Sequence, residues 1–388
     1  MKIAFIGQKG IPALSGGVEK HVEKIATRLA SKGHEVTVYV RSQYTPPSLF
    51  EFEGVRLVHM PSIKTKHLDA ITHTLFCSLH ALFQPYDVIH FQSIGPSVLA
   101  FIPRILKPKA RVVATFHSRD YFHKKWNPLA RLFLHVAEYL TCTLPERTIV
   151  ISETLAAYAE KTYRKKFALI PNGADVAFEP ETEFLVQSGI RPKRYILSVS
   201  RLIEHKGIHY LIKAFQELER MGKMPNNFKL VIVGKNSETA EYEKYLKFMS
   251  VDQKNILFLG ERIGKELASL FSHAAVFVQP SEDEGLSLAL LEAMGYGVLP
   301  IVSDIPANIE AVKDGAGVTF KNKDVESLKN ELAYYINRPE EAEKIGAAAR
   351  ESIEKNYSWD AIASRTLEVY EDVLKKEHSE KNYVHVEG

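Results

Sequence analysis

Cysteine is nearly absent from this chain of 388 residues, which contains only Cys77 and Cys142. Two cysteines cannot form a disulfide framework, so the sequence predicts two packed thiols and a reducing, cytoplasmic environment. The chain also has no uninterrupted apolar run of the roughly 18 to 20 residues that a membrane-spanning helix needs. Its longest candidate, ITHTLFCSLHALF, is short and contains His73 and His80. The opening segment KIAFIG is typical of a strand rather than of a signal peptide. These absences argue against a disulfide-rich secreted protein and against an integral membrane protein.

Several metal and nucleotide motifs are absent as well. The chain has no D-x-D pair, no H-E-x-x-H and no C-x-x-C, so we expect no dedicated divalent-metal site. The P-loop pattern G-x-x-x-x-G-K-[ST] is missing, which argues against an ordinary P-loop NTPase. The strict G-x-G-x-x-G spacing is missing too, which disfavours a dinucleotide. The sequence therefore predicts no cofactor.

Charge is unevenly distributed, although the net charge is only +3. Residues 1–170 contain 23 Lys and Arg against 12 Asp and Glu (23 − 12 = +11), and the remainder contains 27 against 35 (27 − 35 = −8). This asymmetry favours an anionic partner for the first half. Because no nucleic-acid motif accompanies the charge, we expect no nucleic acid and favour a phosphate-bearing acceptor or an anionic membrane surface. Ordinary solvated lysines are the alternative; FHKKW (122–126) and KTYRKKF (161–167) are the candidate basic patches.

In the first half, short runs rich in Val and Ile alternate with amphipathic stretches. Near-continuous apolar runs are typical of parallel strands that are covered on both faces. Between the first two runs, apolar residues recur at helical spacing from Val18 to Leu29, and Gly33 is the expected cap. Repeated strand, helix and strand predict a doubly wound α/β domain. The predicted strands are KIAFIG, EVTVYV, VRLVHM, DVIHF, RVVATFH and RTIVIS.

The same pattern restarts near residue 192 and predicts a second α/β domain. Its predicted strands are YILSVS, KLVIVG, NILFLG, AVFVQP and VLPIVS, and its predicted helices span 207–220, 240–249, 264–272 and 287–295. We therefore expect two tandem Rossmann-like domains, at 1–180 and 181–360, followed by a C-terminal helix and polar tail at 361–388. Two such domains facing each other would leave an interdomain cleft at the carboxyl ends of their strands, where ligands bind.

The segment PSEDEGLSLALLEAMGYG (280–297) carries two glutamates, Glu284 and Glu292, eight positions apart (292 − 284 = 8). Ser287 can cap a helix that begins there, so Glu284 is predicted in the loop and Glu292 inside the helix. Eight helical residues span about 12 Å, whereas glycosidase carboxylate pairs lie roughly 5 to 9.5 Å apart. The spacing argues against a hydrolase pair and favours carboxylates that bind two ends of one ligand. The alternative is two ordinary glutamates, but Glu292 lies in the apolar stretch LALLEAM and needs a partner.

Cations and glycines follow other predicted strands. Arg201 and Lys206 come after YILSVS and suit a diphosphate, with surface solvation as the alternative. Gly16 and Gly17 precede the first helix, where backbone N–H groups can approach an anion, although a simple turn is possible there. His117 ends the strand RVVATFH, and a lone histidine is more often structural.

Taken in order, these motifs carry a resemblance that extends from residue 15 to residue 304. The chain resembles the retaining GT-B glycosyltransferases of glycosyltransferase family 4. The segment PSEDEGLSLALLEAMGYGVLPIVSD matches the E-x7-E signature of that family and is the most specific motif. The weaker matches are SGGVEK, ATFHS, VIS, IPNGADV, SRLIEHKG and FLGER.

The resemblance implies a role for each matched residue. Glu292 would bind the ribose hydroxyls of a donor nucleotide, and Glu284 would contact the donor sugar. Arg201 and Lys206 would hold the diphosphate and stabilise it as it leaves, in place of a metal ion. The remaining implied contacts are those of the Gly16 and Gly17 backbone with the diphosphate, His117 with the sugar, Arg262 and Ile263 with the base, and Gly285, Leu286 and Ser287 with the donor. Many members have Phe-Gly where this chain has Leu286 and Ser287, so the identity of the sugar is not implied.

The resulting hypothesis is a retaining, metal-independent, hexosyltransferase-like enzyme of glycan, polysaccharide or glycolipid assembly. It would move a sugar from a nucleotide-diphosphate donor, bound by the 181–360 domain, to a glycan or lipid-linked acceptor on the 1–180 domain. We expect it in the cytoplasm, with peripheral association at the inner face of the membrane as a further hypothesis. The alternatives are a GT-B sugar-nucleotide epimerase and a non-catalytic nucleotide-sugar-binding protein; a dinucleotide-dependent oxidoreductase is disfavoured.

Overall fold

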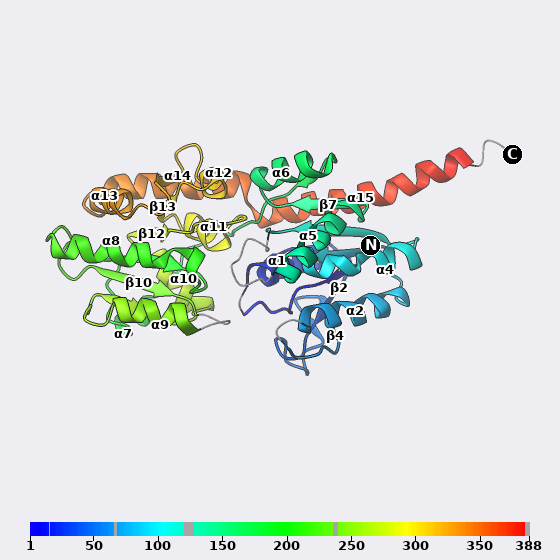
Figure 1. Ribbon diagram of the computed structural model, residues 1–388, viewed down its shortest axis with the longest axis horizontal. Helices are drawn as coiled ribbons and strands as arrows, with labels where there is room; N and C mark the ends of the chain where they lie inside the picture. Colours follow the sequence, from blue (N-terminus) through cyan, green and yellow to red (C-terminus); the bar gives the residue numbers. More distant parts are fainter. Residues whose placement is uncertain (15, 66–67, 120–127, 236–239, 385–388) are drawn as a thin grey trace. The chain divides into compact units, whose positions relative to one another are not determined.

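The chain divides into two compact units (Figure 1). The computed structural model describes residues 1–14, 16–65, 68–119, 128–235 and 240–384. Unit 1 comprises Met1–Asn172 and Trp359–Gly388, and unit 2 comprises Gly173–Ser358. The sequence-based division places the first boundary at residue 180 and treats 361–388 as a separate segment, whereas the contacts assign the last helix to unit 1.

Unit 1 is built on an eight-stranded sheet with the strand order β3-β4-β2-β1-β5-β6-β7-β8. All neighbouring strands are parallel except β3 and β4. The six predicted strands of the first half are present, and their Val- and Ile-rich runs are largely buried on both faces, except in β4, where Arg56 is exposed. The strands are β1 (Lys2–Ile6), β2 (Glu35–Val40), β3 (Glu51–Phe52), β4 (Val55–His59), β5 (Val88–Gln92), β6 (Arg111–Phe116), β7 (Arg147–Val150) and β8 (Ala168–Leu169).

Helices connect these strands, and the last helix of the chain returns to pack on α1 and β6. The hydroxyl of Tyr370 in this helix lies 2.6 Å from Nδ1 of His90 in β5, inside the unit. Cys77 and Cys142 are free, buried thiols, as predicted. The helices of unit 1 are α1 (Gly17–Ser31), α2 (Asp69–Leu82), α3 (Ile94–Ser97), the 3-10 turn η1 (Val98–Ala100), α4 (Phe101–Leu106), α5 (Pro128–Thr143), α6 (Glu153–Tyr163) and α15 (Trp359–Val384).

Unit 2 is a six-stranded, all-parallel sheet with the order β11-β10-β9-β12-β13-β14. The five predicted strands are present, with one further short strand, β14. The strands are β9 (Tyr195–Val199), β10 (Lys229–Val233), β11 (Ile256–Phe258), β12 (Val276–Gln279), β13 (Leu299–Ser303) and β14 (Val318–Phe320). The helices are α7 (Glu183–Gln187), the 3-10 turn η3 (Glu204–Lys206), α8 (Ile208–Arg220), α9 (Ala240–Met249), α10 (Gly264–Ser272), α11 (Leu288–Gly295), α12 (Pro306–Ala311), α13 (Val325–Ile336) and α14 (Pro339–Asn356).

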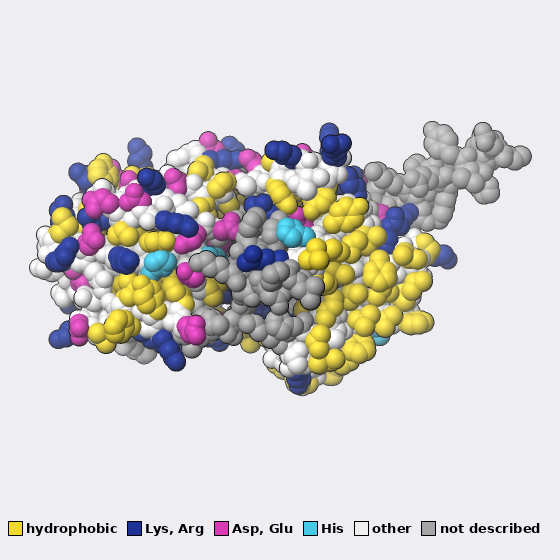
Figure 2. Space-filling model, in the orientation of Figure 1, with side chains coloured by type: hydrophobic (Ala, Val, Ile, Leu, Met, Phe, Trp, Pro, Cys, Tyr) yellow, Lys and Arg dark blue, Asp and Glu magenta, His cyan; other side chains and the backbone are white. Residues whose placement is uncertain are grey.

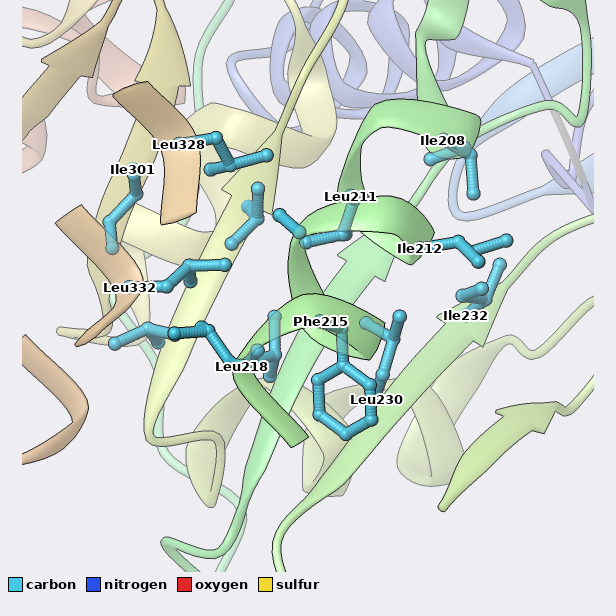
Figure 3. Close-up of a cluster of buried hydrophobic side chains, with 14 of the residues drawn as sticks. Ile208, Leu211, Ile212, Phe215, Leu218, Leu230, Ile232, Ile301, Leu328 and Leu332 are labelled. Carbon is cyan, nitrogen blue, oxygen red and sulfur yellow. The ribbon is translucent and has the colours of Figure 1, made fainter. Parts of the chain in front are cut away.

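One face of α8 carries much of the core of unit 2. Ile208, Leu211, Ile212, Phe215 and Leu218 recur at helical spacing and are buried against the sheet (Figure 3). They meet Leu230 and Ile232 from β10, Ile301 from β13, and Leu328 and Leu332 from α13. This packing fixes the start of α8, and with it the turn that follows β9.

Both sheets contain the doubly wound strand order 3-2-1-4-5-6. In unit 1 the order is β4-β2-β1-β5-β6-β7, once the edge strands β3 and β8 are set aside, and in unit 2 it is β11-β10-β9-β12-β13-β14. The chain reverses direction across the sheet between β1 and β5 and between β9 and β12. Ligands of such sheets bind at the carboxyl ends of the strands beside this switch point. The predicted pair of Rossmann-like domains is therefore confirmed, and each unit has a defined place for a site.

Candidate functional site

In unit 2, the loops after β9 and β12 meet through an ion pair. Nζ of Lys206, which follows β9, lies 2.5 Å from Oε1 of Glu284, which follows β12. The two side chains are only 13% and 10% exposed. The pair therefore lies at the switch point of the sheet and joins two loops that are 78 residues apart in sequence.

Glycine at position 207 lets these two loops approach each other. Gly207 has a φ of 67°, and a Cβ built on it would lie 2.0 Å from the carbonyl oxygen of Pro280. Any other side chain would collide with backbone and would also adopt a strained conformation. A backbone hydrogen bond from Glu282 N to His205 O, of 2.7 Å, holds the loops together. The position of Lys206 opposite Glu284 is thus fixed by close backbone packing.

A chain of buried polar groups supports Glu284 from behind. Ser281 Oγ donates to Glu284 Oε1 at 2.7 Å, and Ser303 Oγ donates to the carbonyl of Ser281 at 2.5 Å. Asn308 Nδ2 donates to Ser303 Oγ at 3.0 Å, and Gln279 Nε2 donates to Asn308 Oδ1 at 2.8 Å. The four supporting residues are all buried. Sequence reasoning missed them, although Gln279 and Ser303 are polar residues at the ends of apolar strands and Ser281 lies inside the signature segment.

This environment keeps Glu284 ionised at neutral pH. Burial alone would raise its pKa, but the charge of Lys206 and the hydrogen bonds from Lys206 and Ser281 together hold the pKa below its ordinary value. An ionised carboxylate can only accept hydrogen bonds. Within the described part of the chain, its second oxygen, Oε2, has no hydrogen-bond partner. Glu284 is therefore suited to accept a hydrogen bond from a ligand hydroxyl.

Arg201 differs from Lys206, although both follow β9. It is exposed, and its guanidinium makes no hydrogen bond or ion pair with any residue that the structure describes. An unengaged guanidinium beside the switch point can bind an anionic ligand with two parallel hydrogen bonds. No group of three or more His, Cys, Asp or Glu residues that could hold a metal ion occurs in the described ranges.

The start of α11 agrees with the prediction. Ser287 is the N-cap, and its side chain accepts a hydrogen bond from Leu290 N at 3.4 Å. Glu292 lies in the second turn and is half-buried. It is near Tyr296, whose pKa is raised to about 12 by burial first and then by the negative charge of Glu292. Glu284 and Glu292 thus lie on either side of the helix start, as expected.

The other residues that the family resemblance implies for the donor occupy differing environments. Gly285 is half-buried, whereas Leu286 is only 5% exposed and is part of the core. Arg262, after β11, has its guanidinium 5.4 Å from the ring centre of Phe184. Ile263 is the N-cap of α10 and is 50% exposed. Of these residues, Ile263 has the largest exposed fraction.

In unit 1, the loop after β1 is tied to α1 by two carboxylates. Lys9 N donates to Glu19 Oε1 at 3.0 Å, and Ala13 N donates to Glu23 Oε2 at 2.5 Å. Gly16 has a φ of 99°, and a Cβ there would lie 2.0 Å from Glu19 Oε2. Gly16 caps α1, which begins at Gly17, without any side-chain hydrogen bond. The glycine pair therefore allows this compact loop, and binding of an anion at its backbone stays a prediction.

His117, after β6, belongs to a buried polar cluster near the other switch point. Its Nε2 lies 2.9 Å from Oε1 of Gln92, the last residue of β5, and its ring meets that of His21 edge-on at 4.9 Å. His21 Nδ1 lies 2.9 Å from Asn172 Oδ1. Burial holds the pKa of His117 well below its ordinary value, with the neighbouring His21 and His90 as further causes. His117 is therefore neutral at pH 7. Sequence reasoning missed His21 and Gln92.

Comparisons with known proteins place the chain in a family. Residues 181–352 match the family model of Glycosyl transferases group 1, and residues 15–178 match that of Glycosyltransferase Family 4. An uncharacterized glycosyltransferase of Methanocaldococcus jannaschii is 29% identical over 97% of this chain and 99% of its own length. The GDP-mannose:cellobiosyl-diphosphopolyprenol alpha-mannosyltransferase of Xanthomonas oryzae pv. oryzae is 25% identical over 96% and 97%. The sucrose-phosphate synthase of Thermosynechococcus elongatus, 21% identical, superimposes with a TM-score of 0.82 over 97% of this chain and 99% of that one. The chain therefore belongs to the GT-B glycosyltransferases of glycosyltransferase family 4.

Proposed function

We propose that this glycosyltransferase moves a hexose from a nucleoside diphosphate sugar to an acceptor hydroxyl, with retention of configuration and without a metal ion. The observation that carries the proposal is the Lys206–Glu284 pair beside the switch point of unit 2. It combines a cation for the diphosphate with an ionised carboxylate for the sugar. The relative from Xanthomonas oryzae pv. oryzae carries GDP-mannose in its name, which supports a nucleotide-sugar donor.

Different residues of unit 2 would bind different parts of the donor. Arg201 and Lys206 would bind the diphosphate and neutralise the charge that develops as it leaves, which is the larger part of the catalysis in such a transfer. Glu284 would accept a hydrogen bond from a sugar hydroxyl through Oε2 and would not serve as a general acid, because its lowered pKa keeps it ionised. Glu292, one turn into α11, would bind the ribose hydroxyls of the same donor.

Unit 1 would contribute residues to the same reaction. We propose that the Gly16 and Gly17 backbone approaches the diphosphate and that neutral His117 lies beside the sugar. The acceptor would be a glycan or a lipid-linked saccharide, and the diphosphopolyprenol in the name of the relative from Xanthomonas oryzae pv. oryzae supports the second.

A panel of nucleotide sugars tests this function in two steps. A true donor should raise the unfolding temperature, because it binds the folded state. That donor is then incubated with simple and lipid-linked acceptors, with and without EDTA, and the anomeric configuration of the product is read from its NMR coupling constant. We expect transfer with retention in both arms. Isomerised donor without a transferred product would indicate an epimerase, and binding without turnover would indicate a non-catalytic protein; either result refutes the proposal.

A further inference from the structure

Three helices of unit 1 expose an unusually apolar surface. In Figure 2, hydrophobic side chains gather over the part of unit 1 where Figure 1 labels α2, α4 and α5. Helix α2 packs on α4, and α5 packs on η1, the turn that leads into α4. The exposed apolar residues, here called the apolar face, are Leu75, Phe76, Leu79 and Phe83 of α2 and its C-cap, Phe101, Ile105 and Leu106 of α4, and Leu132, Phe133, Val136 and Tyr139 of α5. Contiguous patches of this kind on a monomer mark sites of interaction.

The apolar face carries no exposed carboxylate. The three helices contain only two acidic residues, Asp69 and Glu138. Asp69 pairs with Arg41 at 2.6 Å, and its side chain is 13% exposed. Glu138 is buried and accepts hydrogen bonds from the hydroxyls of Tyr158 and Tyr163. Both acids are therefore engaged inside unit 1, and neither can repel an anionic partner at the surface.

Basic residues border the apolar face on two sides. At the end of α5, Lys165 Nζ donates to the carbonyl of Thr143 at 3.0 Å, and the ring of Tyr163 lies 6.2 Å from that of Tyr139 on the face. These residues belong to KTYRKKF (161–167), whose four cations, Lys161, Arg164, Lys165 and Lys166, are all exposed. On the side of α4, Lys107 Nζ donates to the carbonyl of Leu82 at 3.0 Å. The other predicted patch, FHKKW, lies outside the described residues.

We propose that the apolar face binds the surface of a lipid bilayer that contains anionic phospholipids. The apolar side chains would enter the boundary between headgroups and acyl chains, and the basic border would contact lipid phosphates. Among the described helices none is long and apolar enough to cross a membrane, so the contact is a surface one. A second copy of the chain fits less well as the partner. A two-fold contact would bring the basic borders of the two copies close together, and the three helices have no exposed carboxylate that could pair with them.

Co-sedimentation of the full chain with vesicles tests the proposal. The vesicles contain phosphatidylcholine alone or a mixture with phosphatidylglycerol. We expect binding to the mixed vesicles and little to the neutral ones. Phe83→Asp should weaken binding at least about tenfold, since it removes a large apolar side chain and adds a negative charge at the contact. The matched control is Phe248→Asp in α9 of unit 2, because Phe248 is 78% exposed and Phe83 is 85% exposed. Both positions are exposed, so neither variant should unfold, and circular dichroism checks this.

Varying the salt concentration distinguishes binding by insertion of apolar side chains from binding by electrostatic attraction alone. The Debye length falls from about 10 Å at 0.1 M to about 3 Å at 1 M salt. We expect part of the binding to survive at the higher salt, and we expect a Lys165→Glu/Lys166→Glu variant to lose binding mainly at the lower salt. The proposal is overturned by absence of binding to every vesicle, by equal binding to neutral and mixed vesicles, or by equal losses in the Phe83 and Phe248 variants. It is also overturned if sedimentation velocity shows a dimer that Phe83→Asp dissociates while vesicle binding is unchanged.

Discussion

Replacing Lys206 with methionine tests both the stability and the chemistry of the candidate site. Methionine keeps the length of the side chain but removes the ammonium group, so Glu284 is left 10% exposed, and among the described residues only Ser281 still donates a hydrogen bond to its carboxylate. Breaking a buried pair typically costs about 3–5 kcal/mol. Since each side chain retains some exposure, we expect roughly 2–3 kcal/mol here. Unit 2 has 186 residues (358 − 173 + 1), and at about 2–4 °C per kcal/mol its unfolding temperature should fall by roughly 4–12 °C.

The assay is a double-mutant cycle followed by differential scanning calorimetry. Glu284→Gln removes the charge that Lys206→Met leaves unpaired, so the double variant should lose clearly less stability than the sum of the two single variants. The pH dependence has a defined sign. Because the pKa of Glu284 is lowered on folding, its contribution to stability is present above its unfolded pKa of about 4.3 and is lost as pH falls through the folded pKa. The gap between wild type and Glu284→Gln should therefore shrink in acid.

Arg201→Ala is the matched control for this experiment. Its exposed guanidinium has no partner in the described part of the chain, so its loss should leave the unfolding temperature unchanged. Transfer should nevertheless fall strongly in both the Arg201 and Lys206 variants, by on the order of 1.5–3 kcal/mol for each lost charge-assisted contact. The reasoning fails if Lys206→Met is as stable as wild type, or if the Lys206 and Glu284 effects are simply additive.

Three further predictions concern other parts of the protein. Glu292→Ala should weaken binding of the free nucleoside diphosphate in calorimetric titration, whereas Glu284→Ala should weaken it less, through the lost orientation of Lys206, and should mainly depress sugar transfer; the reverse pattern would contradict the assigned roles. Gly207→Ala should destabilise unit 2 by at least about 2 kcal/mol in thermal unfolding, because its Cβ would meet the Pro280 carbonyl. His21, whose pKa burial lowers to about 4, should by itself cost unit 1 about 1.4 kcal/mol of stability per pH unit below 6.5, and other buried histidines such as His117 should add to this loss; calorimetry from pH 7 to pH 5 measures it, and a constant stability would contradict it.

Most of the long strands could be predicted from the sequence because they are buried over nearly their whole length. In a run such as EVTVYV, valine recurs at every second position, which is the period of a strand and not of a helix, so its conformation follows from local pattern. The short edge strands β3, β8 and β14 have only two or three residues each, and β3 and β14 were not predicted. They form at sheet edges by pairing with a longer neighbouring strand. A sequence of two or three residues has no local pattern that distinguishes a strand from a loop.

The return of α15 to unit 1 could not be predicted for a different reason. Its amphipathic pattern predicts a helix but not the surface on which that helix packs. Tyr370 lies 280 residues from His90 in sequence, yet their side chains are 2.6 Å apart. Such a contact depends on the assembled sheet, so it appears only in the three-dimensional structure.

The candidate site shows the same division between local and assembled features. Ser287 as the cap of α11 follows from local spacing, and the structure confirms it. The sequence also marks Lys206 and Glu284, but as two separate ligand contacts. Their mutual bond depends on β9 and β12 being neighbours, which is a property of strand order. Asn308 and Ser303 contribute only through that same assembly.

The bond between Lys206 and Glu284 leaves both groups able to bind a ligand. A lysine ammonium has three donors, and Glu284 uses one of them. The carboxylate has two oxygens, and its two bonds within the described part of the chain both fall on Oε1. The ion pair therefore fixes the direction of each group while leaving two N–H bonds for the diphosphate and one oxygen for the sugar hydroxyl that we propose as ligands. Groups held in place before the ligand arrives need no reorganisation as charge develops on the leaving group. On this reasoning, the buried hydrogen-bonded chain from Gln279 through Asn308 and Ser303 to Ser281 would support the proposed transfer indirectly, because it fixes the position of the Glu284 carboxylate.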